Sequence, residues 1–175
     1  VLVSITGPSS VIEGAATGNF TVSLGQAAYT AVTVNLTYTG TASNGTDYTG
    51  VVSVTIPAGA SSATFSLATI DDALADSGET IIVSLGSITG GGFEAIAANP
   101  ASNSVTTTIS DEATPDTVLV SITGPATVVE GVATGNYTVS LGQAAVTPVT
   151  VNLTYTGTAS NGTDYTGVVS VTIPA

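Results

Sequence analysis

Hydrophobic and polar residues alternate along most of the first 110 positions of the chain. In the segment NFTVSL, Phe20, Val22 and Leu24 fall on one face, and Thr21 and Ser23 fall on the other. This period of two is typical of a β-strand with one buried and one solvated face. The pattern predicts seven strands, at residues 2–5, 19–24, 32–38, 51–56, 63–70, 80–85 and 104–110.

Turn-forming sequence separates these strands, and no segment shows the 3.6-residue period of a helix. The connections TASNGTD, PAGASS and DDALADSGE are rich in Gly, Asn, Asp and Ser, residues that favour turns. About seven strands joined by such connections predict an all-β fold, an antiparallel immunoglobulin-like sandwich. The sequence lacks the cysteines and tryptophan of antibody domains, so only the architecture is predicted.

The segment VLVSITGP occurs twice, starting at Val1 and again at Val118, 117 residues later. Residues 1–58 and 118–175 differ at only seven positions, so the chain is a tandem repeat. We predict a complete sandwich over residues 1–117 and the N-terminal half of a second, near-identical repeat over 118–175. Half a sandwich cannot close a core. The second segment should therefore expose an apolar face. If it is ordered, we expect it either to dock on another chain or to replace residues 1–58 against residues 59–117; a chain that is a fragment of a continuous filament would also resolve the difficulty.

The charge of the chain is entirely negative, with 12 acidic residues and no Lys, Arg or His. Binding of nucleic acid or anionic membrane surfaces is excluded, because both require basic side chains. No apolar stretch is long enough to span a bilayer, so we expect no direct membrane insertion. The lack of His and Cys removes the preferred ligands of zinc, copper and iron. No His or Lys is available to activate a serine, and the carboxylates are better explained as metal ligands, so we predict neither an enzyme nor catalytic residues.

The acidic residues are predicted to gather at one end of the first sandwich. Consecutive antiparallel strands reverse direction, so successive loops fall alternately at the two ends. This parity places nine of the ten acidic residues of the first repeat together: Glu13, Asp47, Asp71, Asp72, Asp76, Glu79, Asp111, Glu112 and Asp116. Two like charges about 4 Å apart repel by up to roughly 4 kcal/mol at an effective dielectric of about 20. We therefore predict a Ca²⁺ site built from these nine residues, since calcium accepts oxygen ligands from flexible loops.

Other interpretations of these acidic residues remain open. A less favoured interpretation is that all of them solvate loop tips, with their repulsion relieved by sodium. Asp47 is also suited to capping the turn NGTD, and Asp116 to a linker turn in TPDT. Glu94 falls at the opposite end as an ordinary exposed side chain. In the second repeat, Glu130 and Asp164 lack the acidic loop of residues 71–79, so no comparable cluster is expected there.

Five segments together resemble the Calx-β repeat, and in particular the tandem repeats of giant RTX-type, LapA-like bacterial adhesins: SITGPSSVIEGAATGNFTVSL, GTDYTG, TIPAG, IDDALADSGET and VTTTISDE. The resemblance covers the whole chain. It implies calcium ligands at Glu13, Asp47, the acidic loop of residues 71–79, and Asp111 with Glu112. It also implies a secreted protein on the bacterial cell surface, exported by a type I system. DDA and DEA stand where sensor versions in sodium/calcium exchangers often carry three acids in a row, which favours fixed structural sites.

The favoured hypothesis is a calcium-rigidified spacer of a surface adhesin, which serves cell adhesion or biofilm formation. The connection EATPDT is short, so the next repeat begins within reach of the acidic cluster, and a bound ion would fix the angle between neighbouring repeats. One alternative is a module that binds a carbohydrate or protein through the loops GQAAYTA and TGGGFEAIAANPASN. Tyr29 in the first of these becomes Val146 in the second repeat, which argues against a repeated pocket. A further alternative is a calcium-sensing Calx-β domain.

Overall fold

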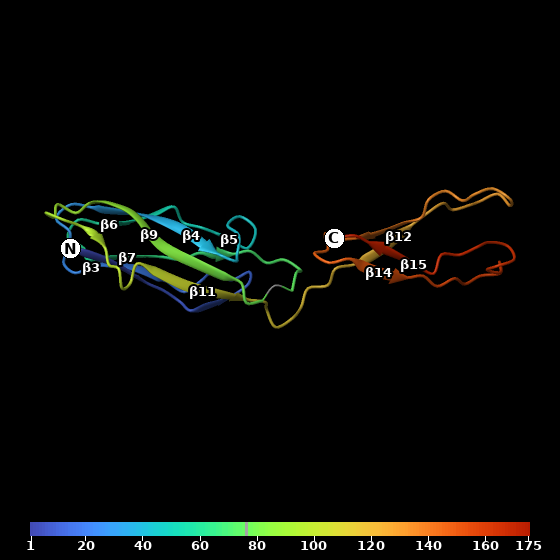
Figure 1. The fold of residues 1–175 in the computed structure, drawn as a ribbon, viewed down its shortest axis with the longest axis horizontal. Coiled ribbons are helices and arrows are strands. Elements are labelled where there is room, and N and C mark those ends of the chain that lie inside the picture. The colour runs from blue at the N-terminus through green and yellow to red at the C-terminus, as the bar shows by residue number, and fades with distance from the viewer. Residues whose placement is uncertain (76) are drawn as a thin grey trace. The chain divides into compact units, whose positions relative to one another are not determined.

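The computed structural model describes residues 1–75 and 77–175, in which every regular element is a β-strand. The chain forms two compact units, Val1–Pro115 and Asp116–Ala175. Figure 1 shows the strands of each unit. No membrane-crossing helix occurs in the part of the chain that the structure describes.

The first unit is a sandwich of two main sheets. One sheet contains, in spatial order, β10 (Ala97–Ala98), β1 (Leu2–Thr6), β3 (Phe20–Leu24) and β7 (Ser62–Phe65). The other contains β2 (Ser10–Ile12), β11 (Ser104–Ser110), β9 (Thr80–Gly90), β4 (Val32–Gly40) and β6 (Ser53–Ile56). A third, short pair joins β5 (Tyr48–Thr49) to β8 (Ala68–Thr69). Pairing is antiparallel except between β1 and β10 and between β2 and β11, so the predicted antiparallel immunoglobulin-like sandwich is confirmed.

The core lies between these sheets and consists of the side chains that alternation placed on the inner faces. Phe20, Val22, Val34 and Ile81 are all fully buried, and burial of each such side chain stabilises the fold by about 1.5–3 kcal/mol. The Phe20 ring stacks on Phe65 with centroids 5.1 Å apart. These rings and aliphatic side chains hold the two sheets together and thereby fix the loops at both ends.

The observed strands differ from the predicted ones where tertiary contacts intervene. The predicted strand at residues 63–70 divides into β7 and β8, which pair in different sheets. Alternation through residues 51–56 places Val52 on the same face as Val54 and Ile56, but Val52 lies just before β6 and is 78% exposed. The fifth strand of the larger sheet, β2, is the three-residue continuation of β1 and crosses to the other sheet.

The second unit repeats part of this ladder without a core. β12 (Val120–Thr123) pairs with β13 (Thr138–Leu141), and β14 (Val149–Asn152) pairs with β15 (Ser170–Ile173). The registers are those of the first unit, with Val120 opposite Leu141 as Val3 is opposite Leu24. None of the described residues of this unit is buried. The expected exposure of an apolar face is therefore confirmed.

Candidate metal centre

Three separate connections of the first unit meet at one end of the sandwich. Glu13 directly follows β2, and Glu112 lies two residues after β11. These strands are parallel neighbours, with Ile12 opposite Ser110, and the Glu13 amide donates to the Ser110 carbonyl at 2.9 Å. Both glutamates therefore leave the sheet at the same end. Asp71 arrives from the other side, two residues after β8.

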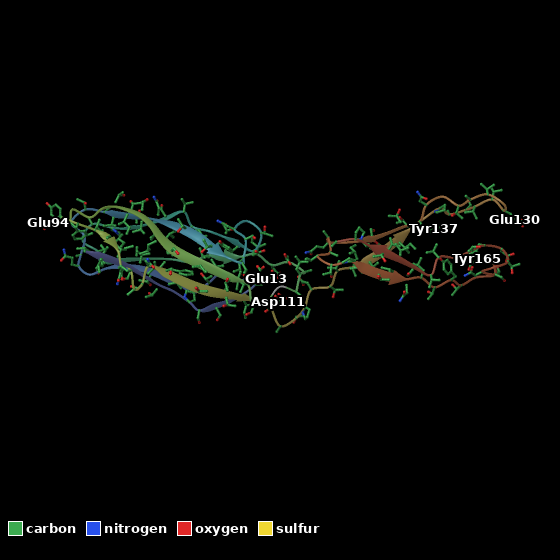
Figure 2. The ribbon with its side chains drawn as sticks, in the orientation of Figure 1. Glu13, Glu94, Asp111, Glu130, Tyr137 and Tyr165 are labelled. Carbon is green, nitrogen blue, oxygen red and sulfur yellow. The ribbon has the colours of Figure 1, made fainter. Side chains whose placement is uncertain are left out.

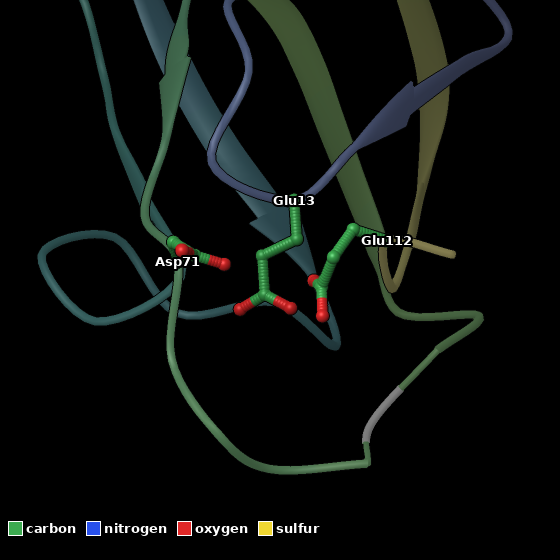
Figure 3. Close-up of side chains that lie close together, drawn as sticks. All are labelled: Glu13, Asp71 and Glu112. Carbon is green, nitrogen blue, oxygen red and sulfur yellow. The ribbon is translucent and has the colours of Figure 1, made fainter. Parts of the chain in front are cut away.

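The carboxylates of Glu13, Asp71 and Glu112 converge. One carboxylate oxygen from each lies within 4.8 Å of the other two. Figure 3 shows Glu13 between the other two side chains, with all three carboxylates directed into the same space. Glu13 is buried, with 9% of its surface exposed, Glu112 is half-buried and Asp71 is exposed. The group therefore has a buried inner ligand and a solvent-facing outer one.

Gly14 allows Asp71 to approach so closely. Its φ is +69°, a conformation that disfavours residues with a side chain. A Cβ atom at this position would lie 3.0 Å from the Asp71 Cβ. The glycine of the EG pair thus forms part of the site, a role that sequence analysis did not assign to it.

Asp111 contributes a buried oxygen that lacks a hydrogen-bond partner. Its amide donates to the Ser77 hydroxyl at 3.1 Å, but its Oδ1 accepts no hydrogen bond within the described structure. Leaving a buried carboxylate oxygen unsatisfied costs about 1–3 kcal/mol or more. Figure 2 shows Asp111 at the same end of the unit as Glu13. A cation at this end would satisfy such an oxygen, so the residues present fit a hard metal ion.

Asp72 and Asp47 are held by hydrogen bonds with nearby backbone. The Asp72 amide donates to the Glu13 Oε1 at 3.1 Å, and its own Oδ1 accepts from the Leu74 amide at 2.6 Å. Asp47 Oδ2 accepts from the Ser43 amide. In the second unit Asp164 makes the same turn with Ser160 at 2.7 Å. Asp47 thus caps a turn, as the alternative interpretation of NGTD predicts. It does not belong to the group of three carboxylates.

The remaining predicted ligands are not part of the group of three carboxylates. Glu79 is half-buried, and its carbonyl accepts from the Ile109 amide at 2.8 Å. Asp116 is exposed and begins the second unit. Asp76 lies outside the described residues. Glu94 is exposed at the opposite end of the first unit (Figure 2), as loop parity predicts.

Two tyrosines pack next to the Asp47 turn. The rings of Tyr38 and Tyr48 have centroids 5.7 Å apart. The Tyr38 hydroxyl donates to the Val51 carbonyl at 2.6 Å and accepts from the Val51 amide at 2.9 Å. Burial raises the pKa of both phenols, and the negative charge of Asp47 raises the pKa of Tyr48 further. Both rings therefore favour the neutral form.

A family model for the LapA domain matches residues 1–112, more than half of the sequence. The chain belongs to the LapA domain family. A second model, for the Calx-beta domain, matches residues 115–172 of this LapA-family chain. The sequence resemblance to a Calx-β-like, LapA-type adhesin region is thus confirmed. No curated protein matches the chain in sequence.

Solved structures with the same fold come from Calx proteins. The crystal structure of CBD12 from CALX1.2 is 22% identical with a TM-score of 0.54, and the match covers 63% of this chain and 45% of that one. The apo-form Calx CBD1 domain is 23% identical with a TM-score of 0.52, over 64% of this chain and 99% of that one. The calcium binding domain CBD12 of CALX1.1 is 24% identical with a TM-score of 0.52, over 64% and 45%. At sequence identities below 25%, these similarities show the fold alone. The LapA-family chain spans less than half the length of each of the two CBD12 structures.

The two family matches define the general class of the protein. It is an adhesin-type or Calx-beta module. Such domains are typically binding or structural modules and not enzymes, and they indicate an extracellular or surface protein. Among the described residues of this LapA-family chain, the acidic cluster of the first unit could hold a metal ion.

Proposed function

We propose that this chain is a calcium-rigidified extender of a bacterial surface adhesin, which projects an adhesive tip for cell adhesion or biofilm formation. The observation that carries the proposal is the convergence of three carboxylates, from three connections, within 4.8 Å of one another. The sequence contains no basic side chain that could neutralise them. The ion is therefore expected to be a structural component of the fold.

Electrostatics supports a cation at this position. Two full charges 4.8 Å apart repel by about 0.9 kcal/mol in water and about 3.5 kcal/mol at an effective dielectric of about 20. A divalent ion supplies the positive charge that turns this repulsion into attraction. Glu13, Asp71 and Glu112 would hold it, with Asp111 as a further oxygen donor. Oxygen ligands from several loops suit Ca²⁺ better than Mg²⁺, which demands a tighter octahedron.

The position of the cluster in the sequence supports the extender role. Asp111 and Glu112 directly precede the segment that leads into the second repeat, which begins at Val118. An ion that fixes these two residues would restrict how the chain leaves the first sandwich. In a tandem array the same restriction would recur at each junction. Extracellular modules bind calcium at about 10⁻⁴–10⁻³ M, concentrations found outside cells.

Thermal unfolding of the full chain in calcium, magnesium or EDTA tests the ion. A calcium concentration 100 times the Kd stabilises the folded state by about 2.7 kcal/mol, and we expect a rise in Tm of about 10 °C for a unit of this size. Glu13→Gln should abolish most of this rise. Glu94→Gln, at the other end of the unit, and Glu130→Gln, the same position in the second repeat, are the matched controls. Equal calcium responses in all three variants would refute the site.

Small-angle X-ray scattering tests the extender role separately. With calcium, the 175-residue chain should give a longer maximum dimension and the profile of a single rod. In EDTA, or with Glu13→Gln in calcium, the profile should be that of two units joined flexibly. If calcium raises the Tm but leaves the scattering unchanged, the ion stabilises the fold without stiffening the chain, and the extender role fails.

A further inference from the structure

The turn that carries Glu13 is held from outside by one threonine. Residues 12–15 form a β-turn, in which the Ala15 amide donates to the Ile12 carbonyl at 3.2 Å. The Thr69 hydroxyl lies 3.1 Å from the Ile12 carbonyl oxygen and 2.5 Å from the Ala15 carbonyl oxygen. A hydroxyl has one hydrogen to donate, and these two oxygens share it. The Thr69 amide also donates to the Ala15 carbonyl, at 3.1 Å, so a single residue fixes both ends of the turn.

Thr69 occupies a buried and paired position in β8. Only 7% of its surface is exposed, and its partner across the ladder is Tyr48 of β5, which is 1% exposed. The amide of the next residue donates to the Asp47 carbonyl at 2.9 Å. Asp71 follows directly, so the backbone that positions the threonine hydroxyl also positions this carboxylate. The distance between Asp71 and the turn of Glu13 therefore depends on how closely Thr69 contacts that turn.

We propose that Thr69 is a positioning residue of the metal centre, whose buried hydroxyl sets the spacing between the Glu13 and Asp71 carboxylates. The inference rests on the proposed calcium-binding function, and it gives Thr69 no contact with the ion. A hydroxyl oxygen approaches a carbonyl oxygen to about 2.5–3.0 Å, because the hydrogen lies between them. A carbon atom in its place meets the oxygen at about 3.3 Å or more. The close approach of the turn to β8 therefore requires a hydroxyl group at position 69.

A methyl group in place of this hydroxyl would push the turn of Glu13 away from β8. In Thr69→Val the new carbon would start 2.5 Å from the Ala15 carbonyl oxygen and would retreat by about 0.8 Å to reach 3.3 Å. Groups that bind a ligand must be held within about 0.5 Å of their productive positions. Because Asp71 stays with β8, the displacement would change its separation from Glu13. We expect the calcium Kd to rise about tenfold, the lower end of the range for residues that orient metal ligands.

Isothermal titration calorimetry of the full chain with calcium tests the role of the hydroxyl. Thr69→Val removes the hydroxyl, whereas Thr69→Ser keeps it and removes only the methyl group. We expect Thr69→Ser to bind calcium with the wild-type Kd, and Thr69→Val to bind it about tenfold more weakly. Wild-type affinity in Thr69→Val would overturn the inference, as would an equal loss of affinity in both variants.

Thr107→Val is the matched control for a general loss of stability. The Thr107 side chain is also buried, with 0% exposed, and its hydroxyl donates to the Pro8 carbonyl at 2.8 Å. Thr107 lies five residues before Glu112, and Pro8 lies five residues before Glu13. Both valine variants should lower the Tm in EDTA, because each loses a buried hydrogen bond. Only Thr69→Val should raise the calcium Kd, and a similar rise in Thr107→Val would show that lost stability alone explains the effect.

Amide hydrogen exchange in EDTA separates this inference from the proposed ion. The Asp72 amide donates to the Glu13 Oε1 at 3.1 Å, a bond that depends on the position of the turn and needs no metal. Exchange of this amide should be several-fold faster in Thr69→Val than in the wild type, and unchanged in Thr69→Ser. If the wild type binds no calcium but the exchange rates behave in this way, Thr69 positions Glu13 and the proposed ion fails. If the wild type binds calcium but Thr69→Val changes neither the exchange rate nor the Kd, the ion stands and the positioning role fails.

Discussion

Replacement of Glu13 by Gln should change stability in opposite directions with and without calcium. The substitution keeps the shape of the side chain and an Oε1 atom that can accept the Asp72 amide, as Glu13 does at 3.1 Å. It removes one of three converging charges. Two of the three pairwise repulsions disappear with it, and the same change removes the buried ligand of the proposed ion.

The size of the stabilisation expected in EDTA follows from the distances between the three carboxylate oxygens. With all three oxygens within 4.8 Å, each lost repulsion is worth at least about 0.9 kcal/mol, the value in bulk water. Two of them give a gain of about 2 kcal/mol in EDTA at low ionic strength. Since Glu13 is buried, the effective dielectric is below that of water and the true gain is larger. For a unit of about this size, 2 kcal/mol raises the Tm by about 8 °C.

Differential scanning calorimetry of the wild type and of Glu13→Gln, in EDTA and across a calcium series, measures the change in Tm. We expect Glu13→Gln to melt above the wild type in EDTA and to show less than a third of the wild-type rise in calcium. Glu130→Gln, in the repeat without a cluster, should leave the melting of the first unit unchanged in both conditions. If Glu13→Gln melts below the wild type in EDTA and responds normally to calcium, the three carboxylates neither repel nor bind an ion as argued.

Three further substitutions test the structure around the site. Gly14→Ala should weaken calcium binding several-fold by displacing Asp71. Gly131→Ala should leave calcium binding unchanged, because Gly131 also has a positive φ but open space around it. Isothermal titration calorimetry of both variants with calcium tests this. Burial raises the pKa of the Tyr38 hydroxyl above its ordinary value of about 10. The contribution of Tyr38 to the free energy of unfolding is therefore complete below pH 10 and is lost as the pH rises through the higher pKa of the folded state. Tyr38→Phe should reduce this loss of stability, which urea unfolding between about pH 8 and pH 11 measures. Phe20→Ala should cost about 3–5 kcal/mol of unfolding free energy in urea, while Tyr137→Ala, at the exposed counterpart, should change it by less than about 0.5 kcal/mol.

Alternation of side chains predicted the sandwich because most strands have one inner face. Phe20, Val22 and Leu24 are all buried, as their spacing requires. The pattern could not predict β2, β5 or β10, or the division of residues 63–70 into β7 and β8, since two or three residues carry no periodic signal. Their pairing depends on neighbours distant in the chain, such as Ile12 opposite Ser110. The exposure of Val52 was not predicted either: its carbonyl accepts from the Leu36 amide at 2.9 Å, but its side chain is 78% exposed.

Loop parity predicted the end at which Glu13, Asp71 and Glu112 lie, but it could not say which oxygens converge. That choice depends on local backbone. Gly14 admits Asp71 through its positive φ, whereas Asp47 has its carboxylate within hydrogen-bonding distance of the Ser43 amide. The nearly identical turn around Asp164, in a unit without a cluster, indicates that residues 43–47 form this turn for local reasons. The ligand assignments of the other predicted residues stay predictions.

The parallel pairing of β2 with β11 has a mechanical consequence. In the first unit the chain enters next to Ala95 and departs after β11 at the opposite end. Tension applied between these two points would slide β1 along β3 and β2 along β11, so that several backbone hydrogen bonds bear the load together. Peeling, in which bonds break one after another, would not occur in this geometry. A sandwich threaded in this way is suited to transmitting a lengthwise pull.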